Sequence, residues 1–260
     1  MSAGRLARAG LAGWLTVAAA LPSCRRGPRA PAAGQTADWD RAAFVLQLVR
    51  HEYREQAETG DQSGAPALLA AIDAARAAIA PGGQPTRWLD AGLGELREAL
   101  VRRDPPRSIA RRCTALGAQL TAHGIRLAMP AARPDLQRGA ALYQTACAPC
   151  HGPPAGPPPA SAAHLVPPPP PVTESALTPY EIFARITYGG AGTAMPSFAD
   201  TLTPSARWDI AFHLFADRWP PCTSTQWPPL SAAAAAHLSD YDIWKAHGYG
   251  AAACLRRNFR

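Results

Sequence analysis

Cys147-Ala148-Pro149-Cys150-His151 is the stretch on which the interpretation of the whole chain depends. Two cysteines separated by two residues and followed at once by histidine match the attachment signature of c-type haem. In that signature both thiols bond covalently to the haem, and the imidazole takes one axial position of the iron. The motif therefore predicts one covalently bound haem c, held by Cys147 and Cys150, with His151 as an iron ligand.

Met195 is the residue expected on the opposite side of the iron. Glycine precedes it at Gly192 and proline follows it at Pro196, which suits a loop that presents one side chain to a metal. Of the other two methionines, Met1 is the initiator and Met129 lies outside the haem region. A thioether opposite histidine favours reduced iron and raises the reduction potential. Met195 as ordinary core filling is the alternative interpretation.

Two helices are expected to cross beside the motif. Gly139 and Tyr143 are four residues apart in a helix that begins at Pro134-Asp135, so they share one face. The missing side chain at Gly139 lets a second helix approach closely. We expect that partner to be the helix after Thr203-Pro204, which carries Trp208, Ile210, Phe212 and Phe215.

A proline-rich loop, residues 152–171, follows the motif. Proline fixes one backbone dihedral and removes a donor, so this loop is expected to be stiff without being helical. One of its carbonyl oxygens is expected to accept the imidazole N–H of His151, which would fix the orientation of the ring. The sequence does not determine which carbonyl does so.

The next helix is opened by Thr178-Pro179-Tyr180-Glu181, where an N-cap, a first-turn proline and a capping-box glutamate stand in their usual places. It is expected to end near Gly189-Gly190. Three of its side chains are candidates for hydrogen bonds to the haem propionates: Tyr180, Arg185 and Tyr188.

Residues 38–130 predict an antiparallel bundle of four amphipathic helices, because apolar residues recur at three-and-four spacing between short breaker segments. No strand pattern competes, so the chain is expected to be all-α. His51, Glu55 and Glu58 share one helix face, but the Glu-x-x-His pairs of di-iron bundles are missing. A polar outer face is the simpler interpretation of these three residues, and a metal site is the alternative.

The first 24 residues predict an export signal, since Arg5 and Arg8 precede an apolar run that is too short to cross a bilayer comfortably. Leu21-Pro22-Ser23-Cys24 also resembles a lipobox, so lipidation of Cys24, simple cleavage and an uncleaved anchor all stay open. Residues 25–37 are expected to form a linker. The protein is therefore expected in the periplasm, with a tether to the inner membrane through its N-terminus as one option.

Export also makes structural disulfides feasible. Cys222 and Cys254 flank the final segment and are the favoured pair, whereas Cys113 falls on an apolar stripe and is expected to be a buried free thiol. The net charge of +7 is not taken as a sign of nucleic-acid binding, because an exported protein rarely meets nucleic acid. We interpret a local basic cluster as a solvated helix face rather than a docking site for an acidic partner: Arg102, Arg103, Arg107, Arg111 and Arg112.

Residues 135–218 resemble class I cytochrome c. The resemblance implies a small helical fold around one haem, with Cys147 and Cys150 at the thioether positions and His151 and Met195 as axial ligands. Residues 134–143, 186–198 and 254–257 look like the cytochrome-bearing periplasmic region of bacterial high-affinity iron permeases, which also carries a helical segment before its cytochrome. The membrane helices with Arg-Glu-x-x-Glu motifs do not follow here, so transport itself is not expected of this chain.

These patterns predict an export or lipoprotein signal (1–24), a linker (25–37), a helical bundle (38–130), a class I cytochrome c-like domain (131–219) and a C-terminal extension (220–260). The expected function is single-electron transfer through a His/Met-ligated haem, with a redox protein, an iron permease or a membrane oxidoreductase as partner. The alternatives are an electron-accepting subunit of ferrous-iron uptake and a haem-based sensor or adaptor. No hydrolase or transferase motif is present, so an electron carrier rather than an enzyme is expected.

Overall fold

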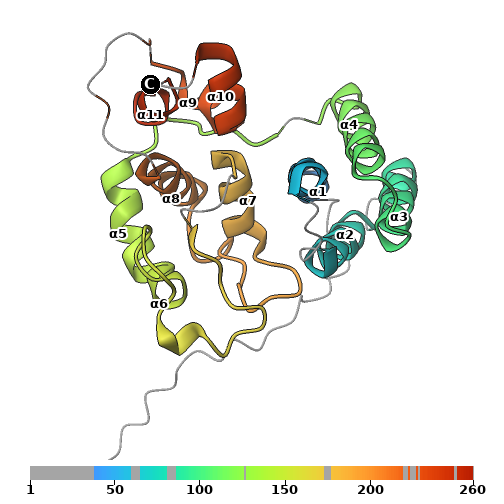
Figure 1. Cartoon of the computed structure of the whole chain (residues 1–260), viewed down its shortest axis with the longest axis horizontal. Coiled ribbons are helices and arrows are strands. Elements are labelled where there is room, and N and C mark those ends of the chain that lie inside the picture. Colours follow the sequence, from blue (N-terminus) through green and yellow to red (C-terminus); the bar gives the residue numbers. More distant parts are fainter. Residues whose placement is uncertain are drawn as a thin grey trace, which may run out of the picture.

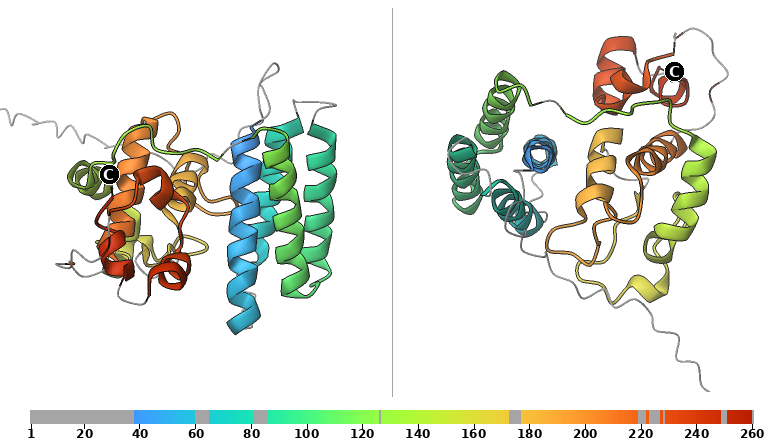
Figure 2. Two further views of the ribbon diagram at one scale, coloured as in Figure 1. Left: turned by 90° about the horizontal axis from the view of Figure 1, so that it is seen from above. Right: turned by 180° about the vertical axis from the view of Figure 1, so that it is seen from behind.

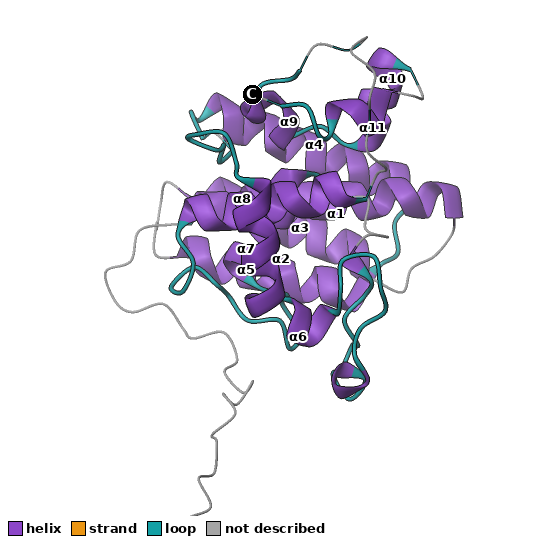
Figure 3. Ribbon diagram, turned by 90° about the vertical axis from the view of Figure 1, so that its left-hand side faces the viewer, coloured by secondary structure: helices purple, strands orange, loops and turns teal. Residues whose placement is uncertain are grey.

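The computed structural model describes residues 38–59, 65–80, 86–125, 127–172, 177–218, 222, 227, 229–248 and 251–259. Their regular structure is helical, apart from one isolated bridge between Leu230 and Phe259, which confirms the all-α prediction (Figure 3). The export signal, Cys24 and the linker lie outside the described residues. Within the described part of the chain, no helix combines the length and the apolar character needed to cross a membrane.

The N-terminal half is a four-helix bundle, as the sequence predicts (Figure 2). The helices are α1 (Trp39–Thr59), α2 (Ala65–Ile79), α3 (Arg87–Val101) and α4 (Pro106–Ala122). Each packs against the next, and α4 returns to α1. Their apolar stripes are buried; examples are Val49, Ile72, Leu93 and Ile109, each 0% exposed.

The second half begins with α5 (Leu136–Ala146) and α6 (Ala148–His151) and continues with α7 (Pro179–Tyr188) and α8 (Pro204–Asp217). Helix α5 crosses α8, as the sequence predicts. At the crossing, a Cβ built on Gly139 would lie 2.2 Å from the carbonyl oxygen of Asp209. Only glycine allows the two backbones to come this close.

Helix α1 lies between α7 and the other helices of the bundle (Figure 1). The buried side chains of the bundle and of the second half form one continuous hydrophobic cluster, in which Phe44 of α1 and Ile186 of α7 are 3% and 4% exposed. The two halves therefore share a core. The division into domains at residue 130 stays a prediction.

The C-terminal segment contains α9 (Ala232–Ala236), α10 (Asp240–His247) and α11 (Ala251–Leu255). Phe215 of α8 packs with Ile243 and Leu255 in a second, smaller cluster. Cys222 and Cys254 form the expected disulfide, with their Cα atoms 4.9 Å apart. The tail is thus closed by a disulfide between two of its own residues and packs on α8 through an apolar contact.

Candidate haem-binding site

The attachment motif forms a short helix directly after α5. The backbone N–H of Cys147 donates to the carbonyl of Tyr143, and that of His151 donates to the carbonyl of Cys147, both at 2.9 Å. Cys147 and Cys150 are therefore one helical turn apart and lie on one side of α6, as two bonds to one planar ligand require. Cys147 is half-buried, whereas Cys150 is exposed.

His151 has a defined partner in the proline-rich loop. Its Nδ1 lies 3.4 Å from the carbonyl oxygen of Pro170. Because a carbonyl only accepts, Nδ1 carries the proton and Nε2 keeps the lone pair that a metal needs. Burial lowers the pKa of His151, so the ring is held neutral. Pro170 is thus the loop carbonyl that the sequence analysis expected but did not identify.

The start of the loop is fixed against α5 by Tyr143. This fully buried phenol donates to the carbonyl of Gly152 at 2.9 Å. Gly152 has a positive φ of 72°, and a Cβ placed on it would lie 2.3 Å from the carbonyl of Pro157. The loop therefore folds back tightly on itself immediately after His151.

Met195 is presented by a loop whose backbone is bonded to the end of α7. Its carbonyl accepts from Gly190 N at 3.1 Å, and its own N–H donates to Thr193 Oγ1 at 3.2 Å. Downstream, Ser197 Oγ donates to the carbonyl of Thr187 at 2.6 Å. The main chain is thus pinned on both sides of Met195, while its side chain is partly exposed.

Helices α7 and α8 are joined by a buried cation and a ring stack that the sequence did not reveal. Arg207 donates from Nη1 to Thr187 Oγ1 at 2.6 Å and lies over the Phe183 ring, 5.2 Å from its centroid. Phe183 stacks on Trp208, with centroids 4.1 Å apart. Arg207 is 7% exposed, and burial lowers its pKa. Nothing in the local sequence distinguishes it from a surface arginine.

Asp209 is a second buried polar residue that sequence analysis missed. It is 1% exposed, accepts from the backbone N–H of Asp135 at 2.8 Å and pairs with the guanidinium of Arg138. It therefore connects α8 to the first turn of α5, close to Gly139. The sequence offers one sign of this role: Asp209 is a carboxylate on the apolar side of α8.

The three candidate propionate ligands on α7 have other partners. The Tyr180 ring lies 4.9 Å from the ring of His237, and the Arg185 guanidinium lies 5.9 Å from the centroid of Phe44. Tyr188 donates from its hydroxyl to Asp38. These contacts are with α1 and the C-terminal segment. A propionate role for the three residues stays a prediction.

The donor set fits a covalently attached haem. Burial raises the pKa of the Cys147 thiol to about 12, so it is neutral at physiological pH rather than a thiolate ready to bind an ion. Among the described residues, no group of three or more His, Cys, Asp or Glu side chains is arranged to hold a metal ion. The side chains of His51, Glu55 and Glu58 lie outside the described part. Cys113 is a buried free thiol, as expected.

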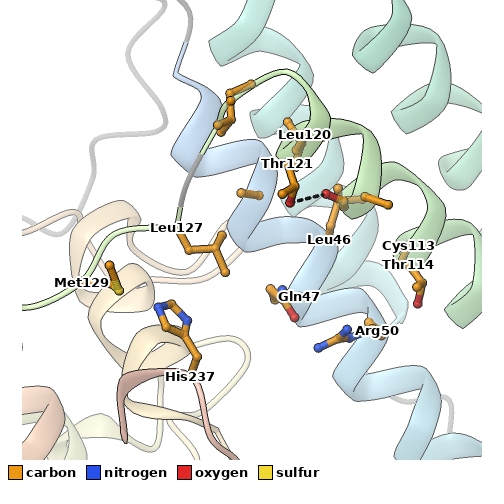
Figure 4. A pocket seen from close by; sticks show the side chains of 15 residues that line it. Leu46, Gln47, Arg50, Cys113, Thr114, Leu120, Thr121, Leu127, Met129 and His237 are labelled. Carbon is orange, nitrogen blue, oxygen red and sulfur yellow. Dashed lines mark hydrogen bonds between the residues drawn. The ribbon is translucent and has the colours of Figure 1, made fainter. Parts of the chain in front are cut away.

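Two cavities lie on the bundle side of the molecule. One, of about 620 Å³, is lined by α1, α4 and His237 (Figure 4), and the second, of about 600 Å³, shares Arg50 and Thr114 with it. No residue of the attachment motif lines either cavity. They are therefore separate from the candidate haem site.

Comparison with known families gives one match. Residues 134–214 match the family described as cytochrome C oxidase, cbb3-type, subunit III, and this span contains Cys147, Cys150, His151 and Met195. We found no match among curated proteins and none among solved structures. The resemblance to iron permeases is thus not shown. A domain of the matched type binds its haem covalently, so the chain carries haem c. Residues 134–214 are thus similar to the cytochrome c domain of subunit III of cbb3-type cytochrome oxidases, which supports a cytochrome c in this part of the chain.

Proposed function

We propose that this protein is an extracytoplasmic monohaem cytochrome that carries single electrons, with His151 and Met195 as the axial ligands of the iron. The observation that carries the proposal is that the matched span contains both an imidazole oriented through Nδ1 and a methionine whose backbone is hydrogen-bonded in place. Export and a membrane tether are part of the proposal and rest on residues 1–24 of the sequence.

In this function the haem supplies reversible one-electron redox chemistry, and the chain supplies its environment. Cys147 and Cys150 would hold the ring covalently. Pro170 orients His151 through Nδ1 and increases the basicity of Nε2. The pinned loop presents Met195, whose thioether favours the reduced state of the iron. No side chain is required to transfer a proton, which agrees with an electron carrier rather than a catalyst.

Met195→Ala tests the ligand assignment directly. Removing the thioether should lower the reduction potential and abolish the sulfur-to-iron charge-transfer band, because the replacement has no soft donor. Potentiometric titration and absorption spectroscopy of the haem-loaded protein measure both. Met129→Ala is the matched control, since Met129 is 52% exposed and lies outside the cytochrome c domain.

An unchanged spectrum in Met195→Ala would show that another residue is the ligand. Carbon monoxide binding by the reduced wild-type protein at neutral pH would instead indicate an open axial position, and so favour the haem-based sensor.

Electron uptake from ferrous iron is the second proposal, and it rests on the sequence resemblance to iron permeases alone. Stopped-flow mixing of the oxidised protein with ferrous iron, in the presence of a partner permease, tests it through the rate of haem reduction. Acceleration by the permease supports a role in iron uptake. Equal rates with and without the permease leave the general electron carrier.

A further inference from the structure

The C-terminal end of α7 is held by the first two turns of α1. Tyr188, the last residue of α7, donates from its hydroxyl to Asp38 Oδ1 at 3.2 Å. Arg41 lies over the same ring, 4.9 Å from its centroid, and its Nη2 donates to the Tyr188 carbonyl at 3.4 Å. Phe44 stacks on the ring, with centroids 6.0 Å apart. Both the side chain and the main chain of Tyr188 are thus bound to the bundle.

Asp38 is itself fixed in the bundle. Its N–H donates to the carbonyl of Ala78 at the end of α2, at 3.1 Å, and its Oδ1 accepts from the N–H of Arg41 at 3.0 Å. Burial, followed by the nearby Asp38 and Asp40 carboxylates, raises the pKa of Tyr188, so the phenol keeps the proton that it donates. The start of α1, the end of α2 and the end of α7 therefore meet at one residue, Asp38: its backbone N–H binds α2, and its carboxylate binds α1 and α7.

The Met195 loop leaves α7 directly after this anchor and touches α2. Gly189, with φ of 75°, turns the chain, and a Cβ built on it would lie 2.7 Å from the carbonyl of Met195. At the outer bend, a Cβ built on Gly192 would lie 3.2 Å from the Cβ of Ala70. The loop is therefore enclosed between the end of α7 on one side and α2 on the other.

We propose that α1 and α2 act as a clamp that holds the Met195 loop in place and so keeps the thioether at the iron. Asp38, Tyr188 and Ala70 are the positioning residues. This inference rests on the proposed function, because it requires Met195 to be an axial ligand. The bundle then controls how often the sixth position of the iron becomes accessible.

Imidazole binding to the oxidised, haem-loaded full chain measures the clamp, since added imidazole reaches the iron only while Met195 is displaced. Asp38→Ala removes the acceptor for Tyr188 and should speed imidazole binding on the order of tenfold, the usual consequence of losing a hydrogen bond to a charged group. Asp38→Asn retains an acceptor oxygen and should restore most of the wild-type rate.

Ala70→Leu tests the α2 side of the clamp by a different route. The larger side chain would overlap with Gly192 and displace the Met195 loop. It should therefore also accelerate imidazole binding. Ala77→Leu is the matched control: it lies about two turns further along the same helix, where its side chain is exposed, and it should leave the rate unchanged. If circular dichroism shows that Asp38→Ala does not fold, Ala70→Leu decides the question.

A double variant distinguishes an effect on the Met195 loop from a general change in access to the haem. In Met195→Ala there is no thioether to displace, so Asp38→Ala should no longer change the rate of imidazole binding; a persisting acceleration overturns the inference. Wild-type rates of imidazole binding in both Asp38→Ala and Ala70→Leu overturn the inference as well. If these variants keep a normal sulfur-to-iron band, the proposed function stands even though the clamp does not. If the wild-type protein lacks that band and Met195→Ala leaves the spectrum unchanged, Met195 is not the ligand and the proposed function is wrong.

Discussion

Gly139 sets the distance between α5 and α8 by itself. The atoms nearest to a Cβ at this position are the carbonyl oxygen and carbon of Asp209, at 2.2 and 2.6 Å, and both belong to the backbone of a buried helix. A flexible side chain could rotate away from such a contact, but a helix backbone cannot. The single missing methyl group thus determines the packing on which the attachment motif depends.

Gly139→Ala should therefore destabilise the protein by about 3 kcal/mol, at the upper end of the usual cost of overpacking. Gly117→Ala is the matched control, because a Cβ on Gly117 in α4 would meet nothing within 4 Å. It should stabilise the protein by about 0.5–1 kcal/mol through its helix propensity. Urea unfolding of both variants measures the difference. Equal stabilities of the two variants would mean that α8 can move away from a Cβ at position 139.

At the scale of elements, α7 shows how far local sequence determines structure. Thr178 Oγ1 accepts from Glu181 N at 3.2 Å, and the Glu181 carboxylate accepts from Thr178 N at 2.7 Å, so the predicted capping box is present. The helix ends at Tyr188 with Gly189 as its C-cap, close to the predicted end. Both ends depend on bonds between residues three or four apart, which the sequence displays directly.

Thr178→Ala removes one half of this box. It should lower the free energy of unfolding by about 1 kcal/mol, the usual cost of an N-cap. Thr178→Ser keeps the acceptor oxygen and should remain close to wild type. Thermal unfolding followed by circular dichroism compares the two. A serine variant as unstable as the alanine variant would assign the effect to the lost methyl group rather than to the hydrogen bond.

At the scale of the whole molecule, packing between distant segments decides what α7 does. The structure packs Tyr180, Arg185 and Tyr188 against α1 and the C-terminal segment, while their predicted contacts to the haem propionates stay a prediction. The same shared core joins the bundle to the cytochrome c domain. The bundle thus packs directly against the part of the chain that carries the attachment motif.

The Cys222–Cys254 disulfide closes a loop across a sequence separation of 32 residues. Replacing both cysteines by serine should reduce stability by about 3–4 kcal/mol in the chain-entropy account, since the unfolded chain gains freedom. Chemical denaturation measures the loss, and the mass change on reduction and alkylation verifies the bond in the wild type. Cys113→Ser does not affect the bond and serves as the cysteine control in the mass measurement. An absent mass shift at Cys222 and Cys254 would contradict the pairing.

The sequence by itself predicted the four bundle helices, α5, α7 and α8, and the identity of the cofactor, because these follow from short-range chemistry: a five-residue motif, caps, prolines and three-and-four periodicity. It also named His151 and Met195, which stay a prediction as ligands. Only the tertiary structure decided that the Pro170 carbonyl accepts a hydrogen bond from His151, that Arg207 and Asp209 are buried, and that Tyr188 meets Asp38 across 150 residues. Such partners depend on how whole helices pack, and the residues near them in the chain carry no mark of it.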